Sequence, residues 1–510
     1  MIIAPFAFCP LSRSFMKQHN RNLMSPFHLF WYNLAEKVKR IPFGFLSLLI
    51  RLGKLIIRVA RTIGRAFVRG AEIFARGDVF TKLSFIIMGL ALMVRKQIAK
   101  GLLFLATQVL FVLFFVQFGW NYLKDLGTLG VNAESEFIDP VTGIIMYKPA
   151  DNSMLILLYS VFTLVVVLAF LIIWVQNVKA CWKADRAHKE GSKLTPFKQE
   201  MHSLLDERYH TTLLIAPTIM AFAFVVIPLL FMILIAFTNY DMNHQPPGNL
   251  FTWVGLQNFK DIFGESATKS KTFFYLFRWD VIWAISATFL NYILGLVLAL
   301  MINKKGIKGK KVWRTMFVIT IAVPQFVSLL LMSRLFGDSG PVNLILQNLG
   351  FAPVPFLTNG TTARVMVIII NLWVGIPYTM LITSGILMNI PAELYESARI
   401  DGAGTLRTFF KITMPYMLFV TTPYLITQFV GNFNNFNVIY LLTQGDPKSV
   451  WLYQAGETDL LVTWLYKLTV TYQDYNLASV IGILVFIVSA SMSLIVYNYS
   501  ASAKREEEFQ

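Results

Sequence analysis

Eight long apolar stretches dominate this sequence, and each comes close to the roughly 20 residues that a helix needs to cross about 30 Å of hydrocarbon. Charged residues make up only 14% of the chain, against about 25% in an ordinary globular protein. No stretch has the alternating pattern of a transmembrane barrel, so helices must satisfy the backbone. The sequence therefore predicts an all-α polytopic membrane protein with spans at about 101–122, 153–176, 212–238, 281–302, 315–336, 365–388, 416–437 and 479–499.

The distribution of lysine and arginine among the connecting loops predicts the orientation of the chain. Loop 177–211 contains seven of these residues and loop 303–314 contains six, whereas 123–152 contains two and 337–363 none. Basic loops stay on the cytoplasmic side of a membrane, although the external loop 239–280, with four, departs from the pattern. Both termini are therefore expected in the cytoplasm.

The first hundred residues carry most of the net charge of +17, with 17 of the 45 basic side chains and only three of the 28 acidic ones. Between 44 and 76 the basic residues recur at helical spacing opposite an apolar face, which predicts an amphipathic helix in the headgroup plane. A solvated basic arm or a nucleic-acid contact is the alternative. The apolar run 83–94 is too short to span and predicts an interfacial or re-entrant helix. The basic residues are Arg51, Lys54, Arg58, Arg61, Arg65, Arg69 and Arg76.

The most specific pattern lies at 391–415, between the sixth and seventh predicted spans. Pro391 suits the first turn of a helix, Glu393 complements the helix N-terminus, and Gly402 and Gly404 end it. A short helix held between two spans on the cytoplasmic side is suited to docking in a groove of a partner.

The spacing within this loop resembles the EAA loop of binding-protein-dependent ABC importers. Glu396-Ser397-Ala398 is followed after three residues by Gly402, and after nine more by the residues ITMP at 412–415. Ser and Met replace the family's Ala and Leu. The resemblance implies the permease fold of type I importers and a helix that couples to a separate ATPase subunit. The coupling positions it implies are Glu396, Ala398, Asp401 and Gly402.

Two further segments, NLWVGIPY at 371–378 and GNFNNFN at 431–437, are similar to the larger permease subunit of maltose/maltodextrin transporters. The similarity covers most of 211–500, but the external loop after the third span has only about 40 residues where the enterobacterial subunit carries a whole domain. We therefore expect four regions: a basic N-terminal region 1–100, two additional spans with a cytoplasmic loop at 101–210, a six-helix permease core at 211–500 and a cytoplasmic tail at 501–510.

A polar stripe runs along the sixth and seventh predicted spans. Asn371, Gly375 and Tyr378 share one helical face, as do Asn432 and Asn435. Unpaired amides are costly in lipid, so these should face the bundle interior or a watery cavity. Amides beside aromatic rings suit a sugar, and hydrogen bonding between helices is the alternative.

The family resemblance favours the sugar interpretation, because the corresponding positions line the sugar pocket. Gly431 stands where the maltose subunit has an aromatic ring, and Gln428 replaces a small hydroxyl residue. The expected substrate is maltose or maltodextrin, with a galacto-oligosaccharide or another disaccharide as the alternative. The implied sugar-binding residues are Asn371, Val374, Gly375, Tyr378, Gln428, Gly431, Asn432 and Asn435.

The chain lacks the G-x-x-x-x-G-K-[ST] pattern of a phosphate-binding loop and any placed catalytic constellation, and its six histidines have no ligand-like spacing. It is expected to be no enzyme and to hold no metal or cofactor, with ATP and Mg²⁺ on a partner. The implied partners are a homologous second permease, two ATPase subunits, an extracytoplasmic sugar-binding protein, an oligosaccharide and membrane lipid, without nucleic acid, in a bacterial cytoplasmic membrane. An ion-coupled transporter and a membrane scaffold are the rivals.

Overall fold

The computed structural model describes residues 41–133, 135–138, 143, 145–148, 150–192, 194–304 and 306–499 of the chain. Helices account for nearly all of its regular structure, and the described strands are a single antiparallel pair, β1 (Ser135–Ile138) and β2 (Ile145–Lys148). The predicted all-α class is confirmed. Residues 1–40 of the predicted N-terminal region 1–100, and the whole predicted tail 501–510, lie outside the described residues.

Six helical segments in the described part of the chain are long and apolar enough to cross a membrane. They correspond to six of the eight predicted spans. The segments are Ile98–Leu123 (α6 Ile98–Phe114, η1 Phe115–Gly119, α7 Trp120–Leu123), α8 (Ser153–Lys189), Tyr209–Ile235 (α10 Tyr209–Ala221, η2 Phe222–Val226, α11 Ile227–Ile235), Ala267–Asn303 (α13 Ala267–Ile285, η4 Ser286–Leu290, α14 Asn291–Asn303), α18 (Gly360–Leu387) and Tyr475–Leu494 within α24 (Tyr475–Tyr499).

The other two predicted spans are interrupted. The span predicted at 315–336 is bent at Pro324, because α15 (Lys310–Ala322) and α16 (Gln325–Leu335) meet at an angle of 88°. Pro324 lies at this break, where its ring and missing N–H prevent a continuous helix. The predicted 416–437 span corresponds to α21 (Met414–Phe433) followed by α22 (Phe436–Leu442). Because α21 contains several polar residues, it is less apolar than the six segments above.

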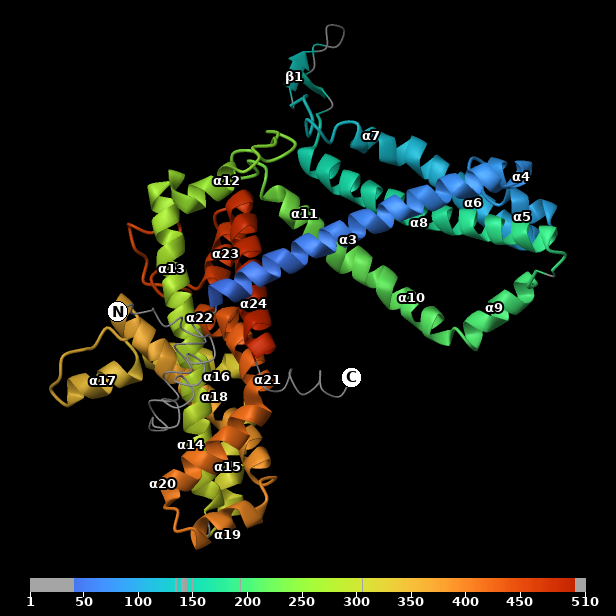
Figure 1. Cartoon of the computed structure of the whole chain (residues 1–510). Helices are drawn as coiled ribbons and strands as arrows, with labels where there is room; N and C mark the ends of the chain where they lie inside the picture. Colours follow the sequence, from blue (N-terminus) through green and yellow to red (C-terminus); the bar gives the residue numbers. More distant parts are fainter. Residues whose placement is uncertain are drawn as a thin grey trace, which may run out of the picture.

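The helices of residues 79–189 form a group beside the core, and the helix that precedes them, 41–76, extends from this group to α24 (Figure 1). The predicted amphipathic segment is part of one helix, α3 (Ile41–Arg76). The apolar run 83–94 is not one continuous helix as predicted: α4 (Val79–Leu83) ends at its first residue, residues 84–89 form turns, and α5 (Leu90–Val94) completes it. Asp78 caps α4 by accepting a hydrogen bond from the Thr81 amide at 2.8 Å. The buried Arg95 guanidinium, 5% exposed, lies 2.7 Å from the Asp78 carboxylate and 3.0 Å from that of Asp185, and so joins α4 to α8.

The permease core is organised around the packing of α14 against α18. Gly295 permits this approach, because a Cβ there would lie 2.7 Å from the Cβ of Thr379. Trp279, Trp283 and Ile370 pack in one buried cluster with residues of α22. At one end of the core lie α19 (Ala392–Ile400) and α20 (Thr405–Thr408), and at the other α12 (Gln257–Lys260) (Figure 1). The remaining short elements are α9 (Phe197–Leu205), η3 (Asp261–Glu265), α17 (Pro341–Asn348), η5 (Phe409–Thr413) and α23 (Leu461–Val470).

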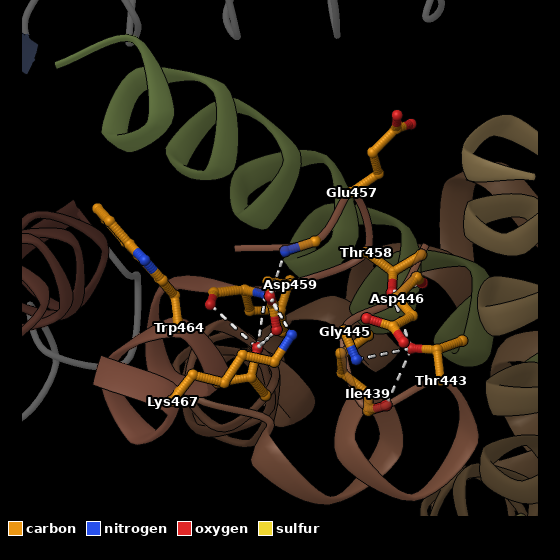
Figure 2. A network of polar contacts seen from close by, with 12 residues as sticks. Ile439, Thr443, Gly445, Asp446, Glu457, Thr458, Asp459, Trp464 and Lys467 are labelled. Carbon is orange, nitrogen blue, oxygen red and sulfur yellow. Dashed lines mark hydrogen bonds and ion pairs between the residues drawn. The ribbon is translucent and has the colours of Figure 1, made fainter. Parts of the chain in front are cut away.

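The connection between α22 and α23 is fixed by buried polar contacts (Figure 2). The Lys467 ammonium lies 2.6 Å from the buried Asp459 carboxylate, which also accepts hydrogen bonds from the Gly456 amide at 2.7 Å and the Thr463 hydroxyl at 2.9 Å. Burial raises the pKa of Asp459 above its ordinary value even though Lys467 acts in the opposite direction. The loop is therefore held in one conformation at the end of the core remote from α19.

Candidate functional site

A polar cavity of about 580 Å³ lies within the permease core. Its walls come from η4, α14, the α15–α16 bend, α18 and the α21–α22 junction. All eight residues that the sequence placed in a sugar pocket line this one cavity: Asn371, Val374, Gly375, Tyr378, Gln428, Gly431, Asn432 and Asn435.

The cavity wall also contains polar residues that the sequence pattern did not indicate. They come from the fourth to the seventh predicted spans, and in the fourth and fifth the isolated hydroxyl and amide residues form no stripe of their own. The spacing of Thr288 and Asn291, one turn apart, was the available signal. The missed polar lining residues are Thr288, Asn291, Tyr292, Thr320, Gln325, Ser328, Thr379, Tyr424, Asn434 and Asn437.

Two amides in the wall have unused hydrogen-bonding capacity. Asn371 is 5% exposed and its Nδ2 has no partner among the described residues. Asn291 donates from Nδ2 to the Ala287 carbonyl at 2.7 Å, while its Oδ1 has no donor in the same part of the chain. An unsatisfied buried polar atom costs about 1–3 kcal/mol. The cavity thus carries an unused donor and an unused acceptor.

Asn432 and Asn435 form hydrogen bonds between helical segments and also line the cavity. The Asn432 Nδ2 donates to the Thr288 hydroxyl at 3.0 Å and its Oδ1 accepts from Asn435 Nδ2 at 3.4 Å, so α21 is bonded to η4. Asn435 Oδ1 accepts from the Val438 amide at 3.1 Å and caps α22. The two asparagines therefore hold helices together and also line the cavity.

Aromatic rings accompany the amides. Trp373 and Tyr378 on α18, Tyr424 on α21 and Phe436 at the start of α22 all line the cavity, and Trp373 and Tyr378 are exposed. At Gly431 a Cβ would meet no atom within 4 Å, so this residue borders open space. None of the described lining residues is Asp, Glu, Lys, Arg or His. The cavity is polar and aromatic without a charged side chain.

The predicted coupling loop forms a short helix with a defined end. Gly402 has φ +71°, and the helix ends with hydrogen bonds from the Ala403 amide to the Ala398 carbonyl at 2.8 Å and from the Gly402 amide to the Arg399 carbonyl at 3.0 Å. These two bonds make a Schellman motif, which needs a left-handed residue where glycine stands. The Tyr395 hydroxyl lies 3.0 Å from that of Thr413 and fixes α19 against η5.

The predicted coupling residues differ in accessibility. Glu396, Asp401 and Gly402 are exposed, but Ala398 is 9% exposed and packs within the chain. The coupling role of Ala398 stays a prediction, and in this conformation little of its side chain is accessible. Apolar side chains are exposed beside the three accessible residues, among them Leu394, Ile400, Leu406 and Phe410.

Residues 291–506 match the model of the family described as binding-protein-dependent transport system inner membrane component. The galactooligosaccharides transport system permease protein of Bacillus subtilis is 36% identical over 424 residues, covering 82% of this chain and 97% of its own. The chain belongs to this permease family. It is a multi-pass inner membrane component, and the matched residues contain α14, α18, the coupling loop and α21.

Other relatives of this permease are also transport proteins. The maltodextrin transport system permease protein of Streptococcus pneumoniae is 35% identical over 424 residues, covering 81% of this chain and 93% of its own. Among solved structures, a bacterial ABC transporter involved in the import of the acidic polysaccharide alginate has a TM-score of 0.49 and 22% identity, covering 59% of this permease and 98% of that chain.

Proposed function

We propose that this permease forms half of the translocation pathway of an ABC importer for an oligosaccharide, with maltodextrin as the substrate. The observation that supports the proposal is that all eight residues implied by the family resemblance line one uncharged polar cavity. Its volume of about 580 Å³ lies in the range of about 300–1,000 Å³ typical of small-molecule sites. A galacto-oligosaccharide is the second candidate, because the galactooligosaccharide permease is as similar to this chain as the maltodextrin permease.

The cavity chemistry fits a neutral sugar. Asn371 offers a free donor and Asn291 a free acceptor, and a sugar hydroxyl can serve either. Trp373 and Tyr378 present rings against which the C–H face of a sugar ring can pack. Gly431 leaves space at a position where the maltose subunit has a ring, which accommodates a longer or differently shaped oligosaccharide.

Energy is supplied from outside the chain through α19. Closure of two ATPase subunits would move the coupling helix through Glu396, Asp401 and Gly402, with Ala398 holding the helix on the core. This places α19 and both termini in the cytoplasm. The cavity then alternates between the two sides of the membrane, closed on its other side by a homologous second permease, and receives sugar from an extracytoplasmic binding protein.

An ion-coupled transporter would need an ionisable group facing the substrate. The buried Asp280 is such a group within a span, but it is not among the cavity-lining residues and accepts a hydrogen bond from the Leu461 amide at 3.3 Å instead. The importer accounts for both the cavity and the coupling loop, whereas the ion-coupled alternative leaves the coupling loop unexplained.

Reconstitution of the complete complex tests the proposal. The two permeases, the ATPase and the binding protein in liposomes should hydrolyse ATP faster with maltotriose than without it, and a galacto-oligosaccharide serves as the matched comparison. If only the galacto-oligosaccharide stimulated ATP hydrolysis, the substrate would be a galacto-oligosaccharide and not maltodextrin. Uptake driven by an ion gradient in liposomes without the ATPase would overturn the importer mechanism.

A further inference from the structure

A second cavity, of about 260 Å³, lies between α3 and α8, away from the sugar cavity. Its wall contains Phe85, Trp174 and Val178. The Trp174 indole N–H donates to the Phe85 carbonyl at 3.0 Å, and the two rings meet edge-to-face with centroids 5.6 Å apart. Phe74 packs against Phe85 in the same way at 5.4 Å. The apolar wall is therefore built from side chains in fixed mutual contact.

Three basic side chains also line the cavity, among small and apolar residues of α3 and α8. Arg65 and Arg69 from α3 and Lys179 from α8 line the cavity, all three are exposed, and none forms an ion pair within the described residues. Two nearby basic side chains do have an acidic partner: Arg95 and Lys189 both contact the Asp185 carboxylate, at 3.0 and 2.8 Å. Within the described residues, Arg95 and Lys189 therefore have a carboxylate partner, whereas the three cations of this cavity have none.

The position of the cavity along α8 corresponds to the membrane surface. The apolar part of α8 ends at Val178, and basic residues follow from Lys179 to Lys189. Trp174 lies one turn before this change, and tryptophan followed by lysine is typical of the cytoplasmic interface of a membrane helix. On α3, Phe67 and Val68 are exposed beside the basic residues. Charged and apolar groups are therefore offered together at headgroup depth.

We propose that this cavity binds the headgroup of an anionic phospholipid. Arg65, Arg69 and Lys179 contact the phosphate, and the start of the acyl chains lies against Trp174 and Val178. Phosphate is the anion that clustered arginine and lysine recognise, and basic residues near the cytoplasmic surface attract anionic lipids. This goes beyond a helix lying on the membrane, because Lys179 and Trp174 belong to a different helix and define one binding position.

Native mass spectrometry of the full-length chain in detergent tests the site. The protein is offered phosphatidylglycerol or phosphatidylcholine, and retained lipid is counted. We expect preferential retention of phosphatidylglycerol. Lys179→Gln should weaken that retention about fivefold, the contribution of one basic group near an anionic surface, and Arg65→Gln should do the same. Lys198→Gln is the matched control, since Lys198 is also exposed and basic but does not line the cavity.

The outcomes separate a site from a diffuse charge effect. An equal loss for Lys198→Gln and Lys179→Gln, or equal retention of the two lipids, would overturn the proposal. Inorganic phosphate or a short single-stranded oligonucleotide is added as competitor. Displacement of the lipid by either at equimolar concentration would reassign the cavity to that ligand. Retention of phosphatidylglycerol in the presence of both, with a loss confined to the two cavity variants, supports the lipid site.

Discussion

Gly375 and Asn291 approach each other so closely that a Cβ at position 375 would lie 2.7 Å from both the Nδ2 and the Oδ1 of Asn291. The first residue is on α18 and the second on α14, and both line the sugar cavity. Gly375→Ala should therefore displace the Asn291 amide and destabilise the fold by about 1–3 kcal/mol, with a matching loss of sugar uptake. Thermal unfolding of the purified chain and uptake by the reconstituted complex measure the two effects.

Gly431→Ala is the control for that substitution. Gly431 lines the same cavity, but a Cβ there meets no atom within 4 Å, and alanine favours the helix by up to about 1 kcal/mol. Its thermal stability should be unchanged or higher. Equal destabilisation by the two alanines would show that the α14–α18 approach is not the cause.

Asn371 provides a test of sugar binding that is separate from stability. Asn371→Leu removes a donor that has no partner among the described residues, so the thermal stability should not fall. Sugar uptake at saturating binding protein should fall about tenfold, the effect of one lost hydrogen bond of about 1.4 kcal/mol. ATP hydrolysis without sugar should be unaffected. Normal uptake by this variant would remove Asn371 from the binding site.

Gly402 allows a test of whether the backbone conformation at the end of α19 matters for coupling to the ATPase. Its φ of +71° lies in the left-handed region, which costs a β-branched residue more than the roughly 1–2 kcal/mol typical of other side chains. Gly402→Val should abolish sugar uptake while the chain still inserts in the membrane. Gly402→Asn, which tolerates this conformation, should retain most of the activity. If both variants transported sugar normally, the Schellman ending of α19 would have no part in coupling.

The Lys467–Asp459 pair predicts a pH-dependent stability. A carboxyl with a raised pKa binds its proton more tightly in the folded state, so stability falls as the pH rises from the ordinary value of 3.8 to the folded value. Lys467→Met removes the charge that lowers this pKa and leaves Asp459 buried. It should cost about 3–5 kcal/mol at neutral pH and less under acidic conditions.

Thermal unfolding between pH 4 and pH 8 measures this dependence. The double variant Lys467→Met/Asp459→Asn is the control, because a neutral amide in place of the carboxylate should abolish the pH dependence and recover part of the stability. A constant loss for Lys467→Met across this range would contradict the prediction.

Much of this arrangement could be predicted from local patterns. Helical periodicity placed Asn371, Gly375 and Tyr378 on one face, and the structure has them on one cavity wall. The bend at Pro324 could not be predicted with the same certainty, because Pro377 and Pro423 lie within α18 and α21 without ending them. Whether a proline ends a helix depends on which neighbours accept the freed carbonyls, and that is a property of the tertiary structure.

The cavity residues that the sequence did not reveal were missed for the same reason, namely that their role depends on tertiary contacts. Thr288 and Asn291 are isolated polar residues in an apolar sequence, and their importance arises only when α21 brings Asn432 within 3.0 Å of Thr288, 144 positions away in the chain. Likewise, the spacing in the coupling loop did not reveal that Ala398 is buried while Glu396 is open. A pattern of residue types identifies a face, but packing decides which members of it are accessible.

The placement of Asp78 sets a boundary for shortening the N-terminus. A polypeptide that starts at Gly77 would lose α3 yet keep both carboxylates on Arg95, so the remaining helices should fold as before. One that starts at Val79 would leave a guanidinium enclosed in protein with a single counter-ion, shared with Lys189. Gly77 and Asp78 therefore mark the boundary between α3, which can be removed, and the part of the chain that the remaining helices need in order to fold.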